Sequence, residues 1–197
     1  MGNKIKIKYP ELTVRLKRMA WHDQATIWAG EPFEPIRNKH CDEMKKIITK
    51  YGWPTISKVG ELASNEAWLL VQHCDHDIKF QKSCLKILKK EVGAGEVSIK
   101  NVAYLDDRVR MNSGKPQLYG TQIIRNIKNV RPYRILNPEK VDERRKRIGL
   151  TLLKDYLELI RKRSKNRIKD SKDSLCPCGS GKKYKRCHGM RKIEKDN

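Results

Sequence analysis

The sequence predicts a mainly α-helical fold: one helical domain with a short β-hairpin, followed by a small cysteine-rich tail. Apolar residues recur at helical spacing through most of residues 8–163 of the 197-residue chain. Residues near 117–136 instead carry the branched and aromatic side chains that are typical of strands. Three of the six cysteines and a histidine lie within residues 173–190. We therefore expect a single helical domain over 8–163, a basic linker over 164–172 and a separate tail motif over 173–190.

The first half of the domain shows three helical patterns. Residues 11–29 place leucine, methionine, isoleucine and tryptophan at mostly helical spacing, and the Gly and Glu-Pro-Phe-Glu-Pro that follow are expected to end this helix. Residues 38–51 form the second predicted helix. It should end at Gly-Trp-Pro over 52–54, because glycine caps helices and proline cannot continue them. Residues 61–74 are apolar nearly all round in their second half, so we expect a central buried helix there.

The second half of the domain continues with helices and one strand pair. Residues 77–92 are amphipathic, and residues 97–111 form a further helical pattern after a glycine-rich turn. The predicted strands lie on either side of Arg-Asn-Ile-Lys-Asn within residues 117–136. A proline starts the helix predicted over 137–150, and residues 150–163 carry the last apolar stripe. Apolar residues thin out after Ile160, which predicts a solvated linker or a fraying helix.

Nothing in the sequence suggests a membrane protein. No apolar run approaches the ~20 residues that a membrane-spanning helix needs. The first residues lack the apolar core of a signal peptide. Cys41, Cys74 and Cys84 lie within helical patterns and are expected to be small buried residues. We therefore expect a cytoplasmic protein without disulfides.

The cysteine-rich tail has the ligands of a structural zinc site. Cys176, Cys178, Cys187 and His188 form a C-x-C-x8-C-H pattern. Zinc prefers four tetrahedral thiolate and imidazole ligands, and four protein ligands leave no open position for catalysis. Glycines between the ligands let the chain turn tightly. Because the segment is too short to bury a core, bound Zn²⁺ would supply its folding free energy.

The same tail resembles a known motif. Residues 173–189, DSLCPCGSGKKYKRCHG, resemble the SEC-C motif, the zinc-binding C-terminal tail of the SecA translocation ATPase, which is also appended to many unrelated bacterial proteins. The resemblance implies structural zinc and a docking surface, since in SecA that tail contacts a chaperone and the ribosome. Here the partner-binding side chains would be Lys182, Lys183, Tyr184, Lys185 and Arg186. The chain has no G-x-x-x-x-G-K-[ST] phosphate loop, so only the role of the tail carries over.

The charge of the chain is concentrated in its last part. The net charge is +22. Residues 161–197 carry 14 basic and 4 acidic side chains, a balance of +10, against 31 and 19, or +12, for residues 1–160. Such density favours a polyanionic or acidic partner: a ribosome, RNA or another nucleic acid, or a secretion chaperone. For the domain itself, compositional drift toward lysine explains the charge equally well.

The domain resembles an uncharacterised, mainly bacterial family of unknown function over roughly residues 10–157. The shared segments are G-W-P, Q-H-x-D, A-Y-L-x-D-R, Q-x-Y-G-T-Q and V-D-x-R-R, at 52–54, 72–75, 103–108, 117–122 and 141–145. This resemblance brings no established mechanism with it.

Polar residues within these segments are the candidate catalytic site: His73, Asp75, Arg108, Tyr119 and Gln122. Histidine acts as acid, base or nucleophile near neutral pH when a carboxylate orients it, and Asp75 is the nearest carboxylate in sequence. Arginines such as Arg108 and Arg144 can bind a phosphate or carboxylate through two hydrogen bonds. The competing interpretation is a buried hydrogen-bond network of Gln72, His73, Asp75, Arg108 and Gln122 that fixes helix packing. A metal site at His73, His76 and Asp77 is a third, weaker interpretation.

Two functions from different classes follow. The first is a zinc-binding protein whose tail docks the chain on a ribosome, nucleic acid or chaperone. The second is a hydrolase or transferase that acts on a phosphate- or nucleotide-containing substrate at His73, with the tail as its targeting element.

Overall fold

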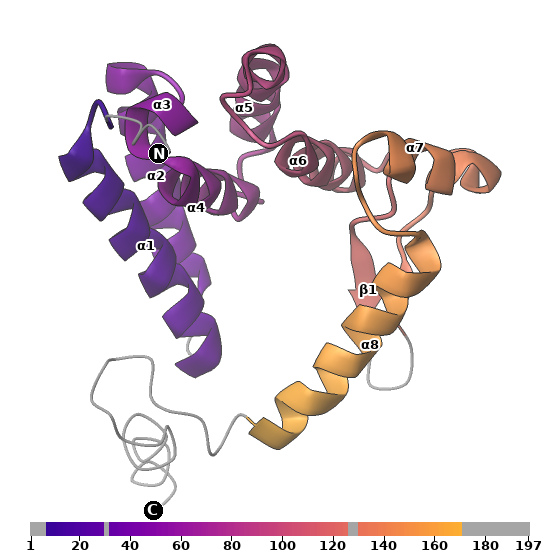
Figure 1. The fold of residues 1–197 in the computed structure, drawn as a ribbon. Helices are drawn as coiled ribbons and strands as arrows, with labels where there is room; N and C mark the ends of the chain where they lie inside the picture. Colours follow the sequence, from indigo (N-terminus) through magenta and orange to yellow (C-terminus); the bar gives the residue numbers. More distant parts are fainter. Residues whose placement is uncertain (1–6, 30–31, 126–129, 171–197) are drawn as a thin grey trace, which may run out of the picture.

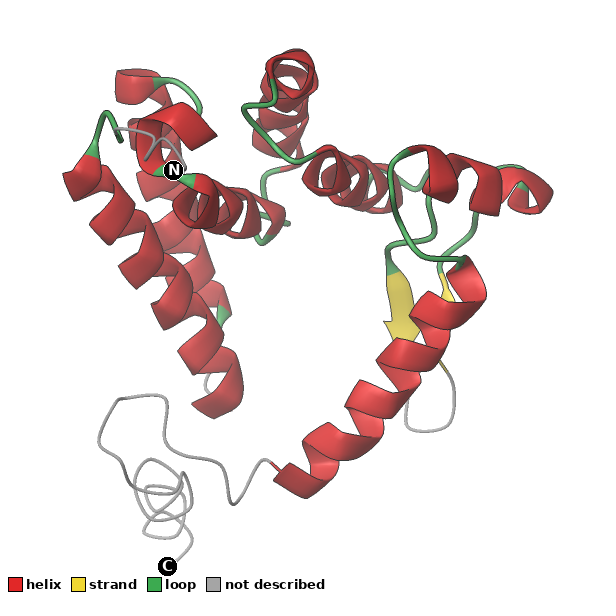
Figure 2. Ribbon diagram, viewed as in Figure 1, coloured by secondary structure: helices red, strands yellow, loops and turns green. Residues whose placement is uncertain are grey.

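The protein folds as a bundle of helices with one small hairpin (Figure 2). The computed structural model describes residues 7–29, 32–125 and 130–170. The α-helices of these residues are α1 (Pro10–Ala29), α2 (Glu34–Tyr51), α3 (Ile56–Val59), α4 (Glu61–Gln72), α5 (Ile78–Glu91), α6 (Ile99–Asn112), α7 (Val141–Arg147) and α8 (Leu153–Asp170). Short 3-10 turns lie at Val92–Ala94 and Pro138–Lys140. The predicted mainly α fold is confirmed.

Helix α4 is the centre of the fold. It contacts α1, α2, α3, α5 and α6, and Figure 1 shows it between the α1–α2 pair and the α5–α6 pair. The burial predicted for residues 61–74 is confirmed, because Ala67, Leu70 and Val71 are buried. A helix that is apolar nearly all round can be stable only when other helices cover most of its surface.

The hairpin and α8 form the other end of the molecule (Figure 1). Strand β1 (Ile123–Arg125) pairs antiparallel with β2 (Val130–Pro132), which confirms the predicted strand pair. Helix α8 packs against β2 and α7. Gly120 joins the loop before β1 to α8: its φ is +68°, and a Cβ there would lie 2.8 Å from the Leu153 side chain. Only glycine fits this position without strain.

Three helix boundaries differ from the prediction. Helix α2 begins at Glu34, within the segment expected to end α1, because Pro35 lies in its first turn, where proline needs no N–H partner. Helix α4 ends at Gln72, so His73 is its C-cap residue and not a helical one. Helix α8 continues to Asp170 through most of the predicted linker. Lysine and arginine are good helix formers, which explains a helix without an apolar stripe.

The domain cysteines are buried free thiols, as predicted. Burial raises the pKa of the Cys84 thiol to about 12, so this side chain is inert near neutral pH. Trp53, in the segment that ends α2, is buried in the core. No helix in the described residues is both long enough and apolar enough to cross a membrane.

Candidate functional site

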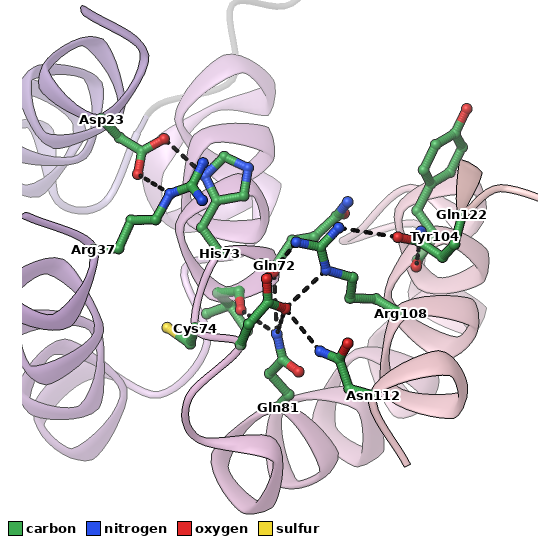
Figure 3. A network of polar contacts seen from close by, with 12 residues as sticks. Asp23, Arg37, Gln72, His73, Cys74, Gln81, Tyr104, Arg108, Asn112 and Gln122 are labelled. Carbon is green, nitrogen blue, oxygen red and sulfur yellow. Dashed lines mark hydrogen bonds and ion pairs between the residues drawn. The ribbon is translucent and has the colours of Figure 1, made fainter. Parts of the chain in front are cut away.

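The turn that ends α4 sends three consecutive side chains to three different parts of the fold. His73 reaches Asp23 of α1, which Figure 3 shows. Cys74 lies next to Cys41 of α2, and Asp75 reaches Arg108 of α6. The turn has this effect because the chain leaves the helix at His73, whose backbone N–H still donates to the carbonyls of the preceding turn. The Q-H-x-D segment therefore joins the surrounding helices to one another.

His73 is oriented by a buried carboxylate. Its Nδ1 lies 2.7 Å from Asp23 Oδ2, and the Asp23 side chain is only 1% exposed. A carboxylate can only accept, so Nδ1 is the donor of this bond, and in the neutral tautomer with that proton the lone pair is on Nε2. Burial opposes ionisation of Asp23, but the hydrogen bond from His73 and the nearby positive charge outweigh it. The pKa of Asp23 therefore lies below its ordinary value.

Other titratable groups surround Asp23. Arg37 of α2 forms an ion pair with it, with Nε 3.5 Å from Oδ1. His40 is buried, its Nδ1 has no hydrogen-bond partner among the described residues, and its ring lies edge-on to His22 at 5.7 Å between centroids. Burial lowers the pKa of His40, which favours its neutral form at pH 7.

Asp75 belongs to a separate network with Arg108, Asn112 and Gln81, three residues that Figure 3 labels. Arg108 donates to both carboxylate oxygens, with 2.8 Å from Nε to Oδ1, and Asn112 donates to Oδ1 at 2.8 Å. Gln81 donates more weakly at 3.4 Å. Burial opposes ionisation of Asp75, but the bonds from Arg108 and Asn112 keep its pKa below the ordinary value. Because Arg108 is engaged on both sides of its guanidinium, it holds helices together and does not present a free anion site.

Gln122 extends this network to the loop before the hairpin. Its Oε1 accepts from Arg108 at 3.1 Å, and its amide nitrogen donates to the carbonyl of Tyr104. Its backbone N–H donates to Gln117, whose amide in turn donates to the carbonyl of Gln122. The hydrogen-bond interpretation therefore describes Asp75, Arg108 and Gln122 correctly.

The site that the sequence suggested is thus divided. His73 is bonded to Asp23, 50 residues earlier, and not to Asp75, because the helix end points the two side chains in different directions. Tyr119 takes part through its backbone: its N–H donates to Asp107 and its carbonyl accepts from Arg145. The structure does not bring the five proposed catalytic residues to one place.

Asp107 anchors the Q-x-Y-G-T-Q loop. Its fully buried carboxylate accepts from the backbone N–H groups of Leu118, Tyr119 and Thr121 and from the Thr121 hydroxyl. Burial raises the pKa of Asp107, and these bonds oppose that rise. Asp106 points elsewhere, to Lys89 and Arg110, as expected for adjacent residues on a helix.

The arginines of the V-D-x-R-R segment are also structural. Arg145 is 1% exposed, donates to the carbonyls of Tyr119 and Thr151 at 2.6 Å each, and lies over the ring of Tyr156. Arg144 donates to the carbonyls of Leu118 and Leu136. Arg144 is therefore not free to hold a phosphate, as the sequence had suggested.

The described residues hold no group of three metal-ligating side chains. Asp77 caps α5 by accepting from the N–H of Phe80 at 2.9 Å, and it pairs with Lys45. The interpretation of His73, His76 and Asp77 as a metal site on one helical face is wrong, because α4 has ended before them. The predicted zinc ligands Cys176, Cys178, Cys187 and His188, and the partner-binding residues 182–186, lie outside the described residues.

Comparisons with known proteins match both parts of the chain. A family of unknown function, DUF6624, matches residues 19–169. The chain belongs to the DUF6624 family. A SEC-C motif follows at residues 174–189, so both resemblances predicted from the sequence are confirmed. No curated protein and no solved structure gives a significant match.

Within the DUF6624 domain, the sequence pattern did not single out Asp23 and Arg37, which surround His73 in the structure. Asp23 lies three residues after Ala20 and seven after Leu16, on the buried face of α1. A charged residue on an apolar stripe is the signal that could have found it, because a buried carboxylate needs partners. Arg37 had no such signal, since it falls in a segment expected to be a loop.

Proposed function

We propose that this DUF6624 protein binds zinc through Cys176, Cys178, Cys187 and His188. We also propose that its basic tail docks the domain on a ribosome or on a nucleic acid. The SEC-C match at residues 174–189 carries the proposal, since that motif is associated with zinc. Helix α8 supports it as well, because Arg161, Lys162 and Arg163 are exposed and the helix ends at Asp170, shortly before the motif. Exposed basic side chains attract polyanions at long range.

We expect the purified, untagged chain to contain one equivalent of zinc. Replacing the three tail cysteines with serine should remove it, because serine is a poor ligand for Zn²⁺. Elemental analysis of both proteins measures the effect, with Cys84→Ala as the matched control that removes a thiol from the domain. Zinc-free wild-type protein, or full zinc content in the triple variant, would contradict the ligand assignment.

We expect the chain to co-sediment with ribosomes and to lose affinity steeply as salt rises, because binding releases counterions from the RNA. Deleting residues 171–197 should abolish binding. The triple cysteine-to-serine variant keeps every basic side chain but loses the zinc site. Its binding therefore shows whether the charge of the tail is sufficient or whether the zinc-bound fold of the tail is also needed. A secretion chaperone is the competing partner, and binding to it would survive nuclease treatment. Binding that ignores salt, or that persists without the tail, would show that the tail does not dock the protein.

A second candidate function is favoured by one observation, the bond between His73 Nδ1 and buried Asp23. This arrangement holds the imidazole in place and leaves Nε2 available as a general base. We propose as the alternative that the domain is a hydrolase or transferase for a phosphate- or nucleotide-containing substrate, targeted by its tail. Asp23, and not Asp75, would orient the histidine. Comparing the turnover of phosphate esters by wild-type protein and by His73 variants tests it.

A further inference from the structure

One buried carboxylate holds two different cationic or titratable side chains. Asp23 Oδ2 accepts from His73 of the α4 end, and Oδ1 pairs with Arg37 of α2 (Figure 3). The Asp23 side chain is 1% exposed, so its carboxylate fixes both partners from inside the protein and does not contact solvent itself. His73 and Arg37 are thereby held next to each other although they come from different helices.

The outer nitrogens of both side chains form no hydrogen bond with the described residues. Arg37 uses only Nε toward Asp23, and its guanidinium stacks on the ring of Phe33, with 4.2 Å between Cζ and the ring centroid. Its two terminal nitrogens make no hydrogen bond within the described part of the chain. The same holds for His73 Nε2. The side chain of His73 is 14% exposed and that of Arg37 is 15% exposed, so both reach solvent at their outer ends.

Three buried polar atoms around Asp23 form no hydrogen bond with the described residues. Two of them, Asp23 Oδ1 and Arg37 Nε, face each other as an ion pair at 3.5 Å, and the third, His40 Nδ1, has no polar partner among those residues. His40 is more than nine-tenths buried, and its charge interaction with Asp23 places it in the same cluster. Folded proteins rarely leave a buried polar atom unpaired, so His40 Nδ1 favours a bound polar group beside this cluster. The presence of Arg37 disfavours a metal cation and favours an anionic group.

We propose that Arg37 and His73 bind the phosphate group of a ligand at this cluster. The two terminal nitrogens of Arg37 donate to two phosphate oxygens, and the P–OH group of a monohydrogen phosphate donates to the lone pair of His73 Nε2. Asp23 holds the imidazole in place from the buried side. A tetrahedral monohydrogen phosphate offers both the acceptor oxygens and the P–OH donor that these side chains require, whereas a planar carboxylate offers only two oxygens. The inference rests on the second proposed function for its site, but it needs no turnover.

The test is a titration of the full-length protein with inorganic phosphate, followed by NMR of ¹⁵N-labelled histidine rings. We expect a saturable shift of the His73 Nε2 resonance, assigned by its loss in His73→Asn. Arg37→Gln should weaken phosphate binding about tenfold or more, and Arg37→Lys should weaken it less, because lysine keeps the charge but not the paired donors. Arg18→Gln is the matched control, since Arg18 is an exposed arginine on α1.

Circular dichroism of each variant shows whether it is folded. If Arg37→Gln does not fold, the comparison of Arg37→Lys with the wild type still tests the proposal. The inference is overturned if phosphate leaves the His73 resonance unchanged, if Arg37→Gln behaves like Arg18→Gln, or if acetate binds as tightly as phosphate. Phosphate binding without any turnover of phosphate esters would support the inference and reject the enzyme candidate. Turnover that depends on His73 without phosphate binding at Arg37 would support the enzyme candidate and reject the inference.

Discussion

Replacing Asp107 with alanine is expected to lower the free energy of unfolding by roughly 3–5 kcal/mol. The side chain is fully buried and accepts hydrogen bonds from three backbone N–H groups and one hydroxyl of residues 118–121. Without it, these donors would lie unpaired inside the protein, and each buried unpaired donor costs about 1–3 kcal/mol. The loop also carries Tyr119, whose carbonyl satisfies buried Arg145, so the damage should spread to α7.

Chemical denaturation followed by circular dichroism measures this loss. The matched control is Asp106→Ala, which removes the neighbouring carboxylate from Lys89 and Arg110, both of which are partly exposed. Water can solvate those cations, so we expect a cost of about 1 kcal/mol. Asp107→Asn should not rescue stability, because its NH₂ group would face N–H donors. Equal losses for Asp106→Ala and Asp107→Ala would mean that Asp107 does not organise the loop.

Replacing His73 with asparagine is expected to lower phosphate-ester turnover by about 10²–10⁴-fold. The free energy of unfolding should stay close to that of the wild type. The asparagine side-chain NH₂ lies where Nδ1 lies in histidine, so it can keep the hydrogen bond to Asp23. It has no counterpart of Nε2 and does not titrate. This variant therefore separates the packing role of His73 from its chemical role.

His73→Ala is the comparison that removes both roles. It should lose activity and also destabilise the fold, by about 1–3 kcal/mol, because Asp23 then lacks its best hydrogen-bond donor. Turnover of p-nitrophenyl phosphate and bis-p-nitrophenyl phosphate, together with thermal denaturation, gives the two readouts. If the wild-type protein turns over neither ester, or if His73→Asn retains full activity, the enzyme candidate is wrong and the role of His73 is packing.

The sequence was a good guide wherever the decisive residues lie close together along the chain. The apolar repeat of residues 61–74 predicted a central helix, and α4 is that helix. Branched residues on both sides of a turn predicted the hairpin of β1 and β2. Helix ends were less predictable, because a proline can stop a helix or lie in its first turn, as Pro35 does.

The candidate site could be predicted only in part. His73 stands out as a polar residue at the end of an apolar helix, and Asp75, Arg108 and Gln122 do form a network. Their grouping with His73 failed, because residues 73 and 75 leave the end of α4 toward different helices. Sequence distance favoured Asp75 as the partner, while packing of α1 against α4 brought Asp23 there instead.

The sequence by itself therefore determined the helical class of the domain, its DUF6624 and SEC-C membership and the four candidate zinc ligands. Periodicity and closely spaced ligands are local properties, and a single stretch of chain contains them in full. Only the tertiary structure decided which carboxylate holds His73, and that Arg37 shares it while Arg108 and Arg144 are engaged elsewhere. These pairings join residues from separate helices, and the packing of those helices, not the spacing of residues along the chain, sets which polar groups meet.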